Sequence, residues 1–388
     1  MSALPIIISG PSCAGKTTIA KRLEELEKYT VVKAVTTRKK REGDYKYKYI
    51  DAKEFEKNEK SNNFLIFDSY QGNKYGILKS DYESIETSKH PILILTVESA
   101  KELIMEKSFN ALWFFIDADD EILQERYKVR GGYSKDMLRA VKTQTASDRK
   151  YAYKANYVLK SSERNLKSMV ELIDALVGSS NMGGGLSHRF IKLMIDCGML
   201  LDNAREESIK GASYDLLLGD EYYYGGKIKH LTATSSFLTI EPYDYAIVSC
   251  KESARIPRDV IGKFGLTVGL FCQGIILSNG PQIDPGFNGT LFCLLFNTSN
   301  RAVHLKRGMH YATIEFNKLF EPAPPYEGVY QGKTKIIDYI PANALHGAIN
   351  ELKKEIEHLK NESKLMQNIY LAVVGIMFAI LSILLVLR

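Results

Sequence analysis

The sequence predicts an α/β domain, an all-β barrel or sandwich, and a helical C-terminal segment, on the strength of three observations. First, apolar runs such as 111–116 alternate with helix-like segments through residues 1–177. Second, short β-rich runs such as 290–297 are punctuated by Gly, Pro and Asn through residues 187–335. Third, residues 369–387 carry no charge. These patterns place two folded domains ahead of a helix.

The composition is that of an ordinary globular protein. The chain has 388 residues, of which 45% are hydrophobic and 25% charged, and its formal net charge is +6. A charge this mild argues neither for nor against nucleic acid. The five cysteines are widely spread and include no C-x-x-C pair, which disfavours a disulfide framework and a zinc site. Residues 1–8 are too short for a signal peptide, so we expect the bulk of the protein in the cytosol.

A glycine-rich loop joins the first apolar run, 6–8, to a helix-like segment, 20–26. This order is what a phosphate cradle requires, because glycines let backbone N–H groups turn towards the phosphates and the helix N-terminus favours negative charge. Lys16 would reach the β and γ phosphates, and the Thr17 hydroxyl would ligate Mg²⁺. The alternative is a glycine turn with a solvated lysine. The expected nucleotide-binding residues are Gly10, Pro11, Ser12, Cys13, Ala14, Gly15, Lys16, Thr17 and Thr18.

Residues 178–186, which include a run of three glycines, are predicted to form a flexible linker between the two domains. Residues 343–367 carry apolar positions at alternating spacings of four and three, which predicts a short coiled-coil stalk. Its Ile and Leu pattern favours a coiled coil of two helices, and a single amphipathic helix is the alternative. The seam positions are Leu345, Ile349, Leu352, Ile356, Leu359, Ser363 and Met366.

The uncharged segment 369–387 would span about 28 Å as a helix, enough to cross most of a hydrocarbon core. A buried soluble helix is the alternative. Lysines gather on its N-terminal side, which favours a cytoplasmic location for that side. The sequence therefore predicts a single-pass tail anchor with both folded domains cytoplasmic. The lysines are Lys353, Lys354, Lys360 and Lys364.

Three ordered motifs in residues 4–177 resemble the guanylate kinase family. They are the phosphate loop, the basic and aromatic stretch 36–49, and the tyrosine loop 72–76. The resemblance implies ATP and Mg²⁺, and a nucleoside monophosphate as the acceptor. It also implies which groups grip the acceptor's phosphate, a role that suits guanidinium forks and tyrosine hydroxyls. Taken alone, stretch 36–49 could be a nucleic-acid patch, but we do not expect nucleic acid as a partner. The implied monophosphate ligands are Arg38, Arg41, Tyr47 and Tyr75.

Phosphoryl transfer depends on positioning and charge neutralisation more than on covalent chemistry. The basic side chains of this domain are therefore the expected catalytic groups. Arg130 precedes Gly131 in what resembles the family's lid turn. The full set is Lys16, Arg38, Arg126, Arg130 and Arg139.

The chain departs from the guanylate kinase pattern where the family reads guanine. Ala34, Ile66 and Ile77 stand in place of hydrogen-bonding residues, and Thr96 and Glu98 stand where the family has a pair of aspartates. A site that recognises a base through hydrogen bonds to its polar edge binds that base much more weakly when the hydrogen-bonding side chains are replaced by apolar ones. We therefore expect guanine recognition to be lost. The acceptor would be another ribo- or deoxyribonucleoside monophosphate, or the domain binds nucleotide without turnover.

Four motifs in residues 190–335 resemble dCTP deaminases and the related dUTPases, families that form trimers. They are 211–219, 256–262, 283–289 and 305–309. Leu294 stands where the deaminases have a water-activating glutamate, and 267–272 lacks their phosphate-binding Arg and Ser. Only Asp284 and Gly286 remain as candidate pocket residues. We expect this domain to be inactive and to serve oligomerisation or nucleotide sensing.

The expected protein is therefore a membrane-anchored nucleoside monophosphate kinase fused to a degenerate deaminase-like barrel. A homotrimer is expected in spite of the two-strand preference of the stalk, because the β domains would form the larger interface. A nucleotide sensor that signals to the membrane helix without catalysis is the alternative. A peptide-binding scaffold is disfavoured by the preserved Lys16 loop.

Overall fold

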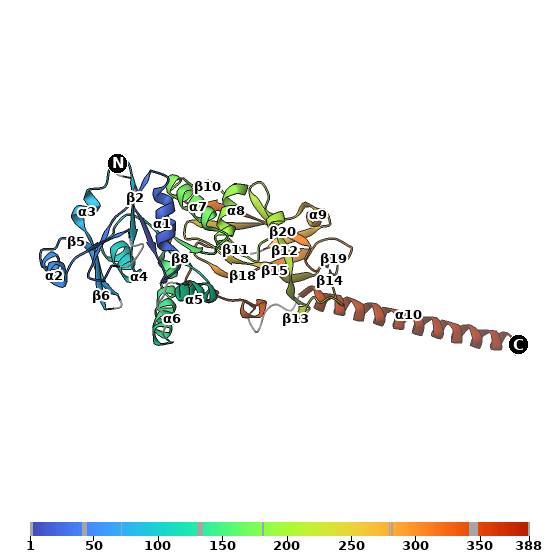
Figure 1. Ribbon diagram of the computed structural model, residues 1–388. Helices are drawn as coiled ribbons and strands as arrows, with labels where there is room; N and C mark the ends of the chain where they lie inside the picture. Colours follow the sequence, from blue (N-terminus) through green and yellow to red (C-terminus); the bar gives the residue numbers. More distant parts are fainter. Residues whose placement is uncertain are drawn as a thin grey trace.

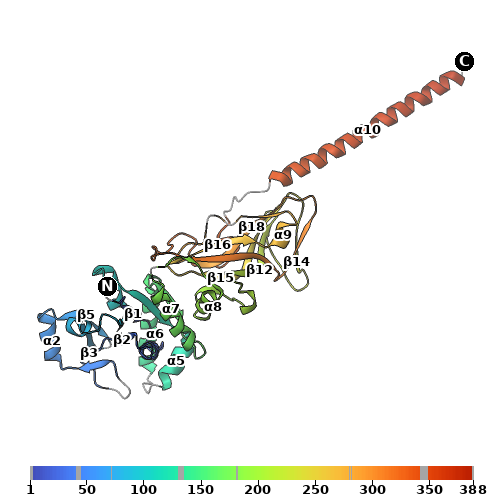
Figure 2. The same cartoon turned by 90° about the horizontal axis from the view of Figure 1, so that it is seen from above.

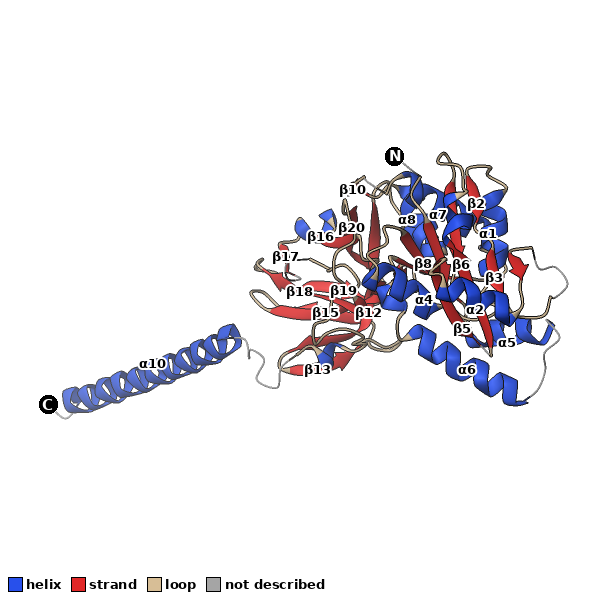
Figure 3. Ribbon diagram, turned by 90° about the vertical axis from the view of Figure 1, so that its left-hand side faces the viewer, coloured by secondary structure: helices blue, strands red, loops and turns tan. Residues whose placement is uncertain are grey.

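The protein is described by a computed structural model in which two compact parts lie side by side and a long helix extends from the second (Figures 1 and 2). The first part mixes helices and strands, whereas the second consists mostly of strands (Figure 3). The residues that the structure describes are 3–40, 45–70, 72–129, 135–180, 182–278, 280, 282–340 and 348–386.

A parallel sheet with the strand order β2, β7, β1, β8, β9 forms the centre of the first domain. Its middle strand is the apolar run predicted first. Ile6 and Ile8 face one hydrophobic cluster, and Ile7 faces another with Trp113 and Phe115. Both faces of the sheet are thus covered, as expected of parallel strands that read as continuous apolar runs. The strands are β1 (Ile6–Ser9), β2 (Tyr29–Val31), β7 (His90–Ile94), β8 (Leu112–Asp117) and β9 (Tyr157–Lys160).

A smaller sheet with the order β4, β3, β6, β5 lies beside the first. Its strands are β3 (Ala34–Thr36), β4 (Tyr47–Tyr49), β5 (Phe64–Tyr70) and β6 (Asn73–Leu78). The helices of this domain are α1 (Lys16–Glu24), α2 (Ala52–Lys60), α3 (Lys79–Glu83), α4 (Val97–Lys101), a π-helical turn (Glu102–Glu106), α5 (Asp120–Val129), α6 (Lys135–Arg149), a 3₁₀ turn (Ala152–Lys154) and α7 (Leu166–Gly178).

Antiparallel pairing dominates the second domain, with the path β10, β20, β12, β15, β18, β17. Buried and less buried residues alternate along β18, the period-two pattern of a strand with one face on a core. The strands are β10 (Gly184–Gly185), β11 (Leu200–Asp202), β12 (Ser213–Tyr224), β13 (Lys227–His230), β14 (Phe237–Ile240), β15 (Tyr245–Arg255), β16 (Val260–Leu266), β17 (Ile275–Ser278), β18 (Asn288–Asn297), β19 (Val303–Lys306) and β20 (His310–Lys318). The helices are α8 (His188–Asp196), α9 (Val268–Phe271), and 3₁₀ turns at Glu206–Ser208 and Ile336–Asp338.

One hydrophobic cluster runs through both domains, because α7 of the first packs against α8 of the second. Polar contacts accompany it: the buried Tyr157 hydroxyl donates to Asp259, and the Lys160 N–H donates to the carbonyl of Cys197 at 2.8 Å. The expected linker 178–186 is not flexible along its whole length, because part of it forms a strand. Its end forms β10, which pairs with β20. The two domains are therefore packed together rather than tethered.

The predicted stalk and the predicted membrane segment belong to one continuous helix, α10 (Ala348–Val386). Within the described residues, Glu355–Ile380 is long and apolar enough to cross a membrane, with a hydropathy of 1.5. This stretch begins before the predicted segment 369–387. Seam residues Ile356, Leu359 and Met366 are exposed on it, while Leu345 lies outside the described residues. The coiled coil itself stays a prediction.

Candidate nucleotide site

The loop between β1 and α1 has the backbone of a phosphate cradle. Gly10 has a φ of 129°, and a Cβ there would lie 2.1 Å from the carbonyl oxygen of Ile116, so no other residue fits. Gly15 has a φ of 101° and caps the N-terminus of α1. The strand, loop and helix predicted from the sequence are thus formed in order. The cradle suits a polyphosphate, because its amides converge at a helix N-terminus.

Two basic side chains are anchored on this loop. The Lys16 ammonium donates to the carbonyl oxygens of Gly10 and Pro11, each at 2.6 Å. The Arg126 guanidinium donates to the Ser161 hydroxyl at 3.1 Å and to the Cys13 carbonyl at 3.4 Å. Both positive charges are therefore held at the mouth of the cradle, where phosphate oxygens would replace carbonyl oxygens as acceptors.

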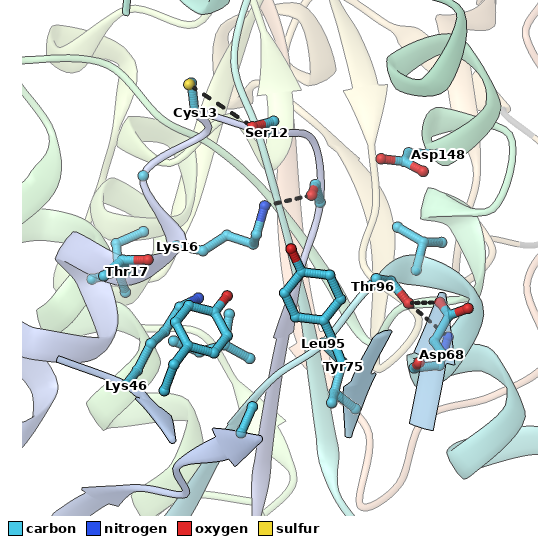
Figure 4. A pocket seen from close by; sticks show the side chains of 18 of the residues that line it. Ser12, Cys13, Lys16, Thr17, Lys46, Asp68, Tyr75, Leu95, Thr96 and Asp148 are labelled. Carbon is cyan, nitrogen blue, oxygen red and sulfur yellow. Dashed lines mark hydrogen bonds between the residues drawn. The ribbon is translucent and has the colours of Figure 1, made fainter. Parts of the chain in front are cut away.

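A cavity of about 830 Å³ opens beside the loop (Figure 4). The loop and α1 line one side through Gly10, Ser12, Cys13, Gly15, Lys16, Thr17 and Thr18. Of the expected loop residues, Pro11 and Ala14 do not line the cavity: Pro11 supplies a carbonyl to Lys16, and Ala14 is fully buried. A volume of this size accommodates a ligand larger than a single phosphate group.

The small sheet brings three of the four expected monophosphate ligands together in this cavity. The Arg38 guanidinium lies 5.2 Å from the ring centroid of Tyr47, and the rings of Tyr47 and Tyr75 lie 5.9 Å apart. Arg38 is only 9% exposed, which limits how far its charge is screened by water. Lys46, which the sequence did not single out, lies 5.0 Å from the same Tyr47 ring.

Of the other three expected arginines, Arg41, Arg130 and Arg139, the structure describes Arg139 alone. Arg41 and Arg130 lie outside the described residues. Arg139 lies exposed on α6 and is not part of the cavity lining. Arg38 and Arg126 are the expected arginines that line the cavity.

Sequence reasoning missed a carboxylate in the cavity wall. Asp148, 7% exposed, accepts a hydrogen bond from the Gln144 side chain at 2.8 Å. Burial raises the pKa of Asp148, while Gln144 and nearby Lys16 partly oppose the shift. The four-residue spacing on α6 puts Gln144 and Asp148 on one helix face. That spacing was the signal that could have identified the pair.

Three of the apolar residues that depart from the family pattern lie in the cavity wall. Ala34, Ile66 and Ile77 are buried and line the cavity. Thr96 caps the N-terminus of α4, where its hydroxyl oxygen accepts the Ser99 N–H at 3.1 Å.

Within the described chain, no group of three or more His, Cys, Asp or Glu side chains is arranged to hold a metal ion. Magnesium does not require such a cage, because it is commonly bound by one or two protein oxygens together with substrate phosphates and water. The Thr17 hydroxyl and the carboxylates of Glu98 and Asp148 line the cavity and are oxygen donors of the kind it prefers. The donor set therefore fits magnesium bound together with a nucleotide.

The candidate residues of the second domain form a turn. Asp284 accepts a hydrogen bond from the Gln282 side chain at 3.1 Å. Gly286 has a φ of 76°, and a Cβ there would lie 2.7 Å from Pro325. Leu294 sits within β18, in register with Ile247 of β15. These contacts are those of a hairpin and a sheet.

The fold and the cavity define a two-domain protein in which a phosphate-loop α/β domain is packed against an antiparallel β domain. The guanylate kinase family model matches residues 2–176, and the dCTP deaminase-like model matches residues 186–319. The chain therefore belongs to both families: it joins a guanylate kinase domain to a dCTP deaminase-like domain. Both family predictions are confirmed.

Individual relatives agree with this assignment. Over 135 residues the chain is 42% identical to a dCTP deaminase of Thermococcus kodakarensis, covering 34% of this chain and 86% of that protein. It is 35% identical over 140 residues to a dCTP deaminase of Pyrococcus horikoshii, covering 36% and 88%. For the first domain, a guanylate kinase of Fusobacterium nucleatum is 30% identical over 161 residues, covering 40% of this chain and 87% of that protein.

Proposed function

We propose that the first domain is an ATP-dependent kinase that transfers the γ-phosphate to a ribo- or deoxyribonucleoside monophosphate. One observation carries this proposal: Lys16 and Arg126 at the loop, and Arg38 with two tyrosines on the small sheet, line a single cavity. A polyphosphate grip and a monophosphate grip in one cavity are what direct transfer between two nucleotides requires.

In the proposed reaction, an oxygen of the acceptor's phosphate attacks the γ-phosphorus of ATP. The bond from that phosphorus to the β–γ bridging oxygen breaks, and the products are ADP and a nucleoside diphosphate. Lys16, Arg38 and Arg126 hold the phosphates in line and offset the charge that develops on them. Thr17 would hold magnesium together with phosphate oxygens, and the metal would supply charge neutralisation on the β and γ groups. Arg41, Arg130 and Arg139 are proposed to complete the grip when nucleotides bind.

The test is ATP-dependent phosphate transfer by the full chain across a panel of ribo- and deoxyribonucleoside monophosphates, followed as ADP release. At least one acceptor should be converted to its diphosphate, and Lys16→Ala should abolish the conversion. If nucleotides bind but no acceptor is phosphorylated, the kinase proposal fails.

The second domain is proposed to be a non-catalytic oligomerisation or nucleotide-sensing module. Leu294 cannot activate water, and the segment 267–272 carries no phosphate-binding Arg or Ser. A trimer is proposed from the resemblance to its family. Ammonia release from dCTP by the unmodified chain would contradict the first part, and a mass other than three protomers in mild detergent would contradict the second.

The helix α10 is proposed to anchor the protein in a membrane, with both folded domains in the cytoplasm. Its stretch Glu355–Ile380 has the length and hydropathy for a single span, and lysines precede its most apolar part. Deleting residues 369–388 should move the protein from the membrane fraction to the soluble fraction. Recovery of the full-length chain in the soluble fraction would contradict the anchor.

A non-catalytic sensor is the second candidate, and the packing between the domains favours it. Because one hydrophobic cluster runs through both domains, nucleotide binding in the cavity can strain the β domain that precedes α10. A sensor would bind ATP and a monophosphate without ADP release. It would also alter disulfide crosslinking between single cysteines introduced along α10, whereas a simple kinase would leave that crosslinking unchanged.

A further inference from the structure

A hydrogen-bonded polar pair, Asp68 and Thr96, lies in the wall of the nucleotide cavity. Asp68 on β5 and Thr96 at the start of α4 are 28 residues apart in sequence, and the Thr96 hydroxyl donates to the Asp68 carboxylate at 2.6 Å. Figure 4 shows this pair across the cavity from Lys16 and Thr17. Both members of the pair line the cavity, and both are partly accessible.

The hydrogen bonds of the pair leave it able only to accept. The single hydroxyl proton of Thr96 is used on Asp68, and its oxygen already accepts the Ser99 N–H. The other oxygen of Asp68 accepts the backbone N–H of Ser69 at 2.6 Å. A carboxylate offers about four lone-pair positions, so unused acceptor capacity remains on Asp68. A group that hydrogen-bonds to this pair must therefore donate.

We propose that Asp68, supported by Thr96, selects nucleoside monophosphates whose base carries an exocyclic amino group. This inference rests on the proposed kinase function and specifies its acceptor class. Cytosine and adenine carry such a group, whereas uracil, thymine and hypoxanthine present a carbonyl oxygen at the corresponding position. Asp68 is a specificity residue in this proposal, and Thr96 is a positioning residue that fixes its carboxylate.

The surroundings of the pair make the discrimination strong. An amino group gains a charge-assisted hydrogen bond to Asp68, whereas a carbonyl oxygen would face the carboxylate and lose its hydration. Ala34, Ile66 and Ile77 line the same cavity with apolar side chains, which offer such an oxygen no donor. Because hydrogen bonds to charged groups contribute about 1.5–3 kcal/mol, the preference should be about 10-fold or more in kcat/KM.

The experiment compares acceptors that differ at one position of the base, using the full chain and saturating ATP. The pairs are dCMP with dUMP, CMP with UMP, and AMP with IMP. The amino member of each pair should have a kcat/KM about 10-fold or more above that of its oxo partner. A smaller ratio in every pair overturns the proposal.

Three variants assign the selection to Asp68. Asp68→Asn keeps the size of the side chain but adds donors, so the amino-to-oxo ratio should fall at least about threefold. Thr96→Val should lower the ratio less, because the carboxylate remains but is no longer fixed. Glu163→Gln makes the same chemical change at an exposed carboxylate elsewhere in the cavity lining. It should leave the amino-to-oxo ratio unchanged. An unchanged ratio in Asp68→Asn, with the variant folded by circular dichroism, overturns the assignment.

Failure of the kinase proposal can be told apart from failure of this inference. If no acceptor is phosphorylated, the same pairs are compared by calorimetric binding to the full chain in the presence of ATP. Tighter binding of the amino members, lost in Asp68→Asn, upholds the selection in a protein that is not a kinase. Equal affinities within every pair overturn it.

Discussion

Two buried carboxylates, Asp148 of the first domain and Glu252 of the second, have different surroundings. Asp148 of the first domain lines the cavity, receives one hydrogen bond from Gln144 and lies near Lys16. Glu252 of the second is 1% exposed and receives the Tyr214 hydroxyl at 3.0 Å and the Leu217 N–H at 3.1 Å. Burial raises the pKa of both carboxyl groups. The comparison teaches that a carboxyl group with a raised pKa indicates a functional site only where the group lines a cavity that also holds charged side chains.

The same contrast holds for the two domains as wholes. The β domain keeps the apolar alternation that a fold requires, but we propose that Leu294 and the segment 267–272 leave it without the polar groups of a deaminase. The first domain keeps its core and also the basic side chains that we propose to bind phosphate. Core packing and catalysis are thus separable demands on a sequence.

The largest expected effect tests the proposed kinase activity of the first domain. Lys16→Ala removes the ammonium that holds the phosphates, so kcat for phosphate transfer should fall by about 100-fold or more. ADP release under saturating ATP and acceptor measures it. Lys21→Ala on the exposed side of the same helix is the matched control and should retain activity. Equal activities in the two variants would remove Lys16 from the site.

The second prediction concerns the junction between the domains. Tyr157→Phe removes the hydroxyl that donates to buried Asp259, leaving that carboxylate with less hydrogen bonding. The free energy of unfolding should fall by about 1–3 kcal/mol. Urea denaturation of the chain lacking residues 369–388 measures this loss, with Tyr153→Phe, which is half-exposed, as the control. A neutral Tyr157→Phe would mean that the junction contributes little.

The third prediction sharpens the comparison of the two carboxylates. A carboxyl group whose pKa is raised by folding lowers stability as the pH rises through its folded pKa, because the unfolded chain releases the proton more easily. Asp148→Asn should therefore be more stable than the wild type at neutral pH, and the difference should shrink as the pH falls below the ordinary carboxyl range. Phosphate transfer should be weaker in this variant, as expected when a functional charge is removed.

Burial raises the pKa of Glu252 as well, but the loss of its hydrogen bonds should outweigh that effect and give its substitution the opposite sign. Its two oxygens accept from two donors, and a glutamine offers a single acceptor oxygen, so Glu252→Gln should destabilise the protein at neutral pH. Urea denaturation over a pH series measures both variants. If both Asp148→Asn and Glu252→Gln stabilise the protein, the hydrogen bonds of Glu252 do not set it apart from Asp148.

The smallest expected effect is in the β domain. Leu294→Glu restores the carboxylate type at that position of β18, but no phosphate-binding Arg or Ser accompanies it in 267–272. Ammonia release from dCTP should stay at background in the wild type and in the variant. Appreciable release by the variant alone would show that one residue separates this domain from catalysis.

Much of the first domain could be read from local pattern. The apolar run 6–8 and the glycines of the loop predict a strand, a positive-φ turn and a helix, because backbone conformation is decided by near neighbours. The resemblance singled out Ala34, Ile66 and Ile77 as departures from the family pattern, and these residues line the cavity. The exposed position of Arg139 was not predictable, because a basic residue on a helix carries no signal of which way the helix face turns.

The sequence by itself determined the two domain classes, their families, the phosphate loop and the apolar C-terminal helix, because each depends on local periodicity or short-range backbone requirements. Tertiary structure alone decided which distant polar groups meet. Asp68 meets Thr96, Asp148 approaches Lys16, and Tyr157 reaches Asp259 across the domain junction. Contacts of this kind depend on how whole elements pack, and packing responds to the shape of the entire core rather than to any neighbouring residue.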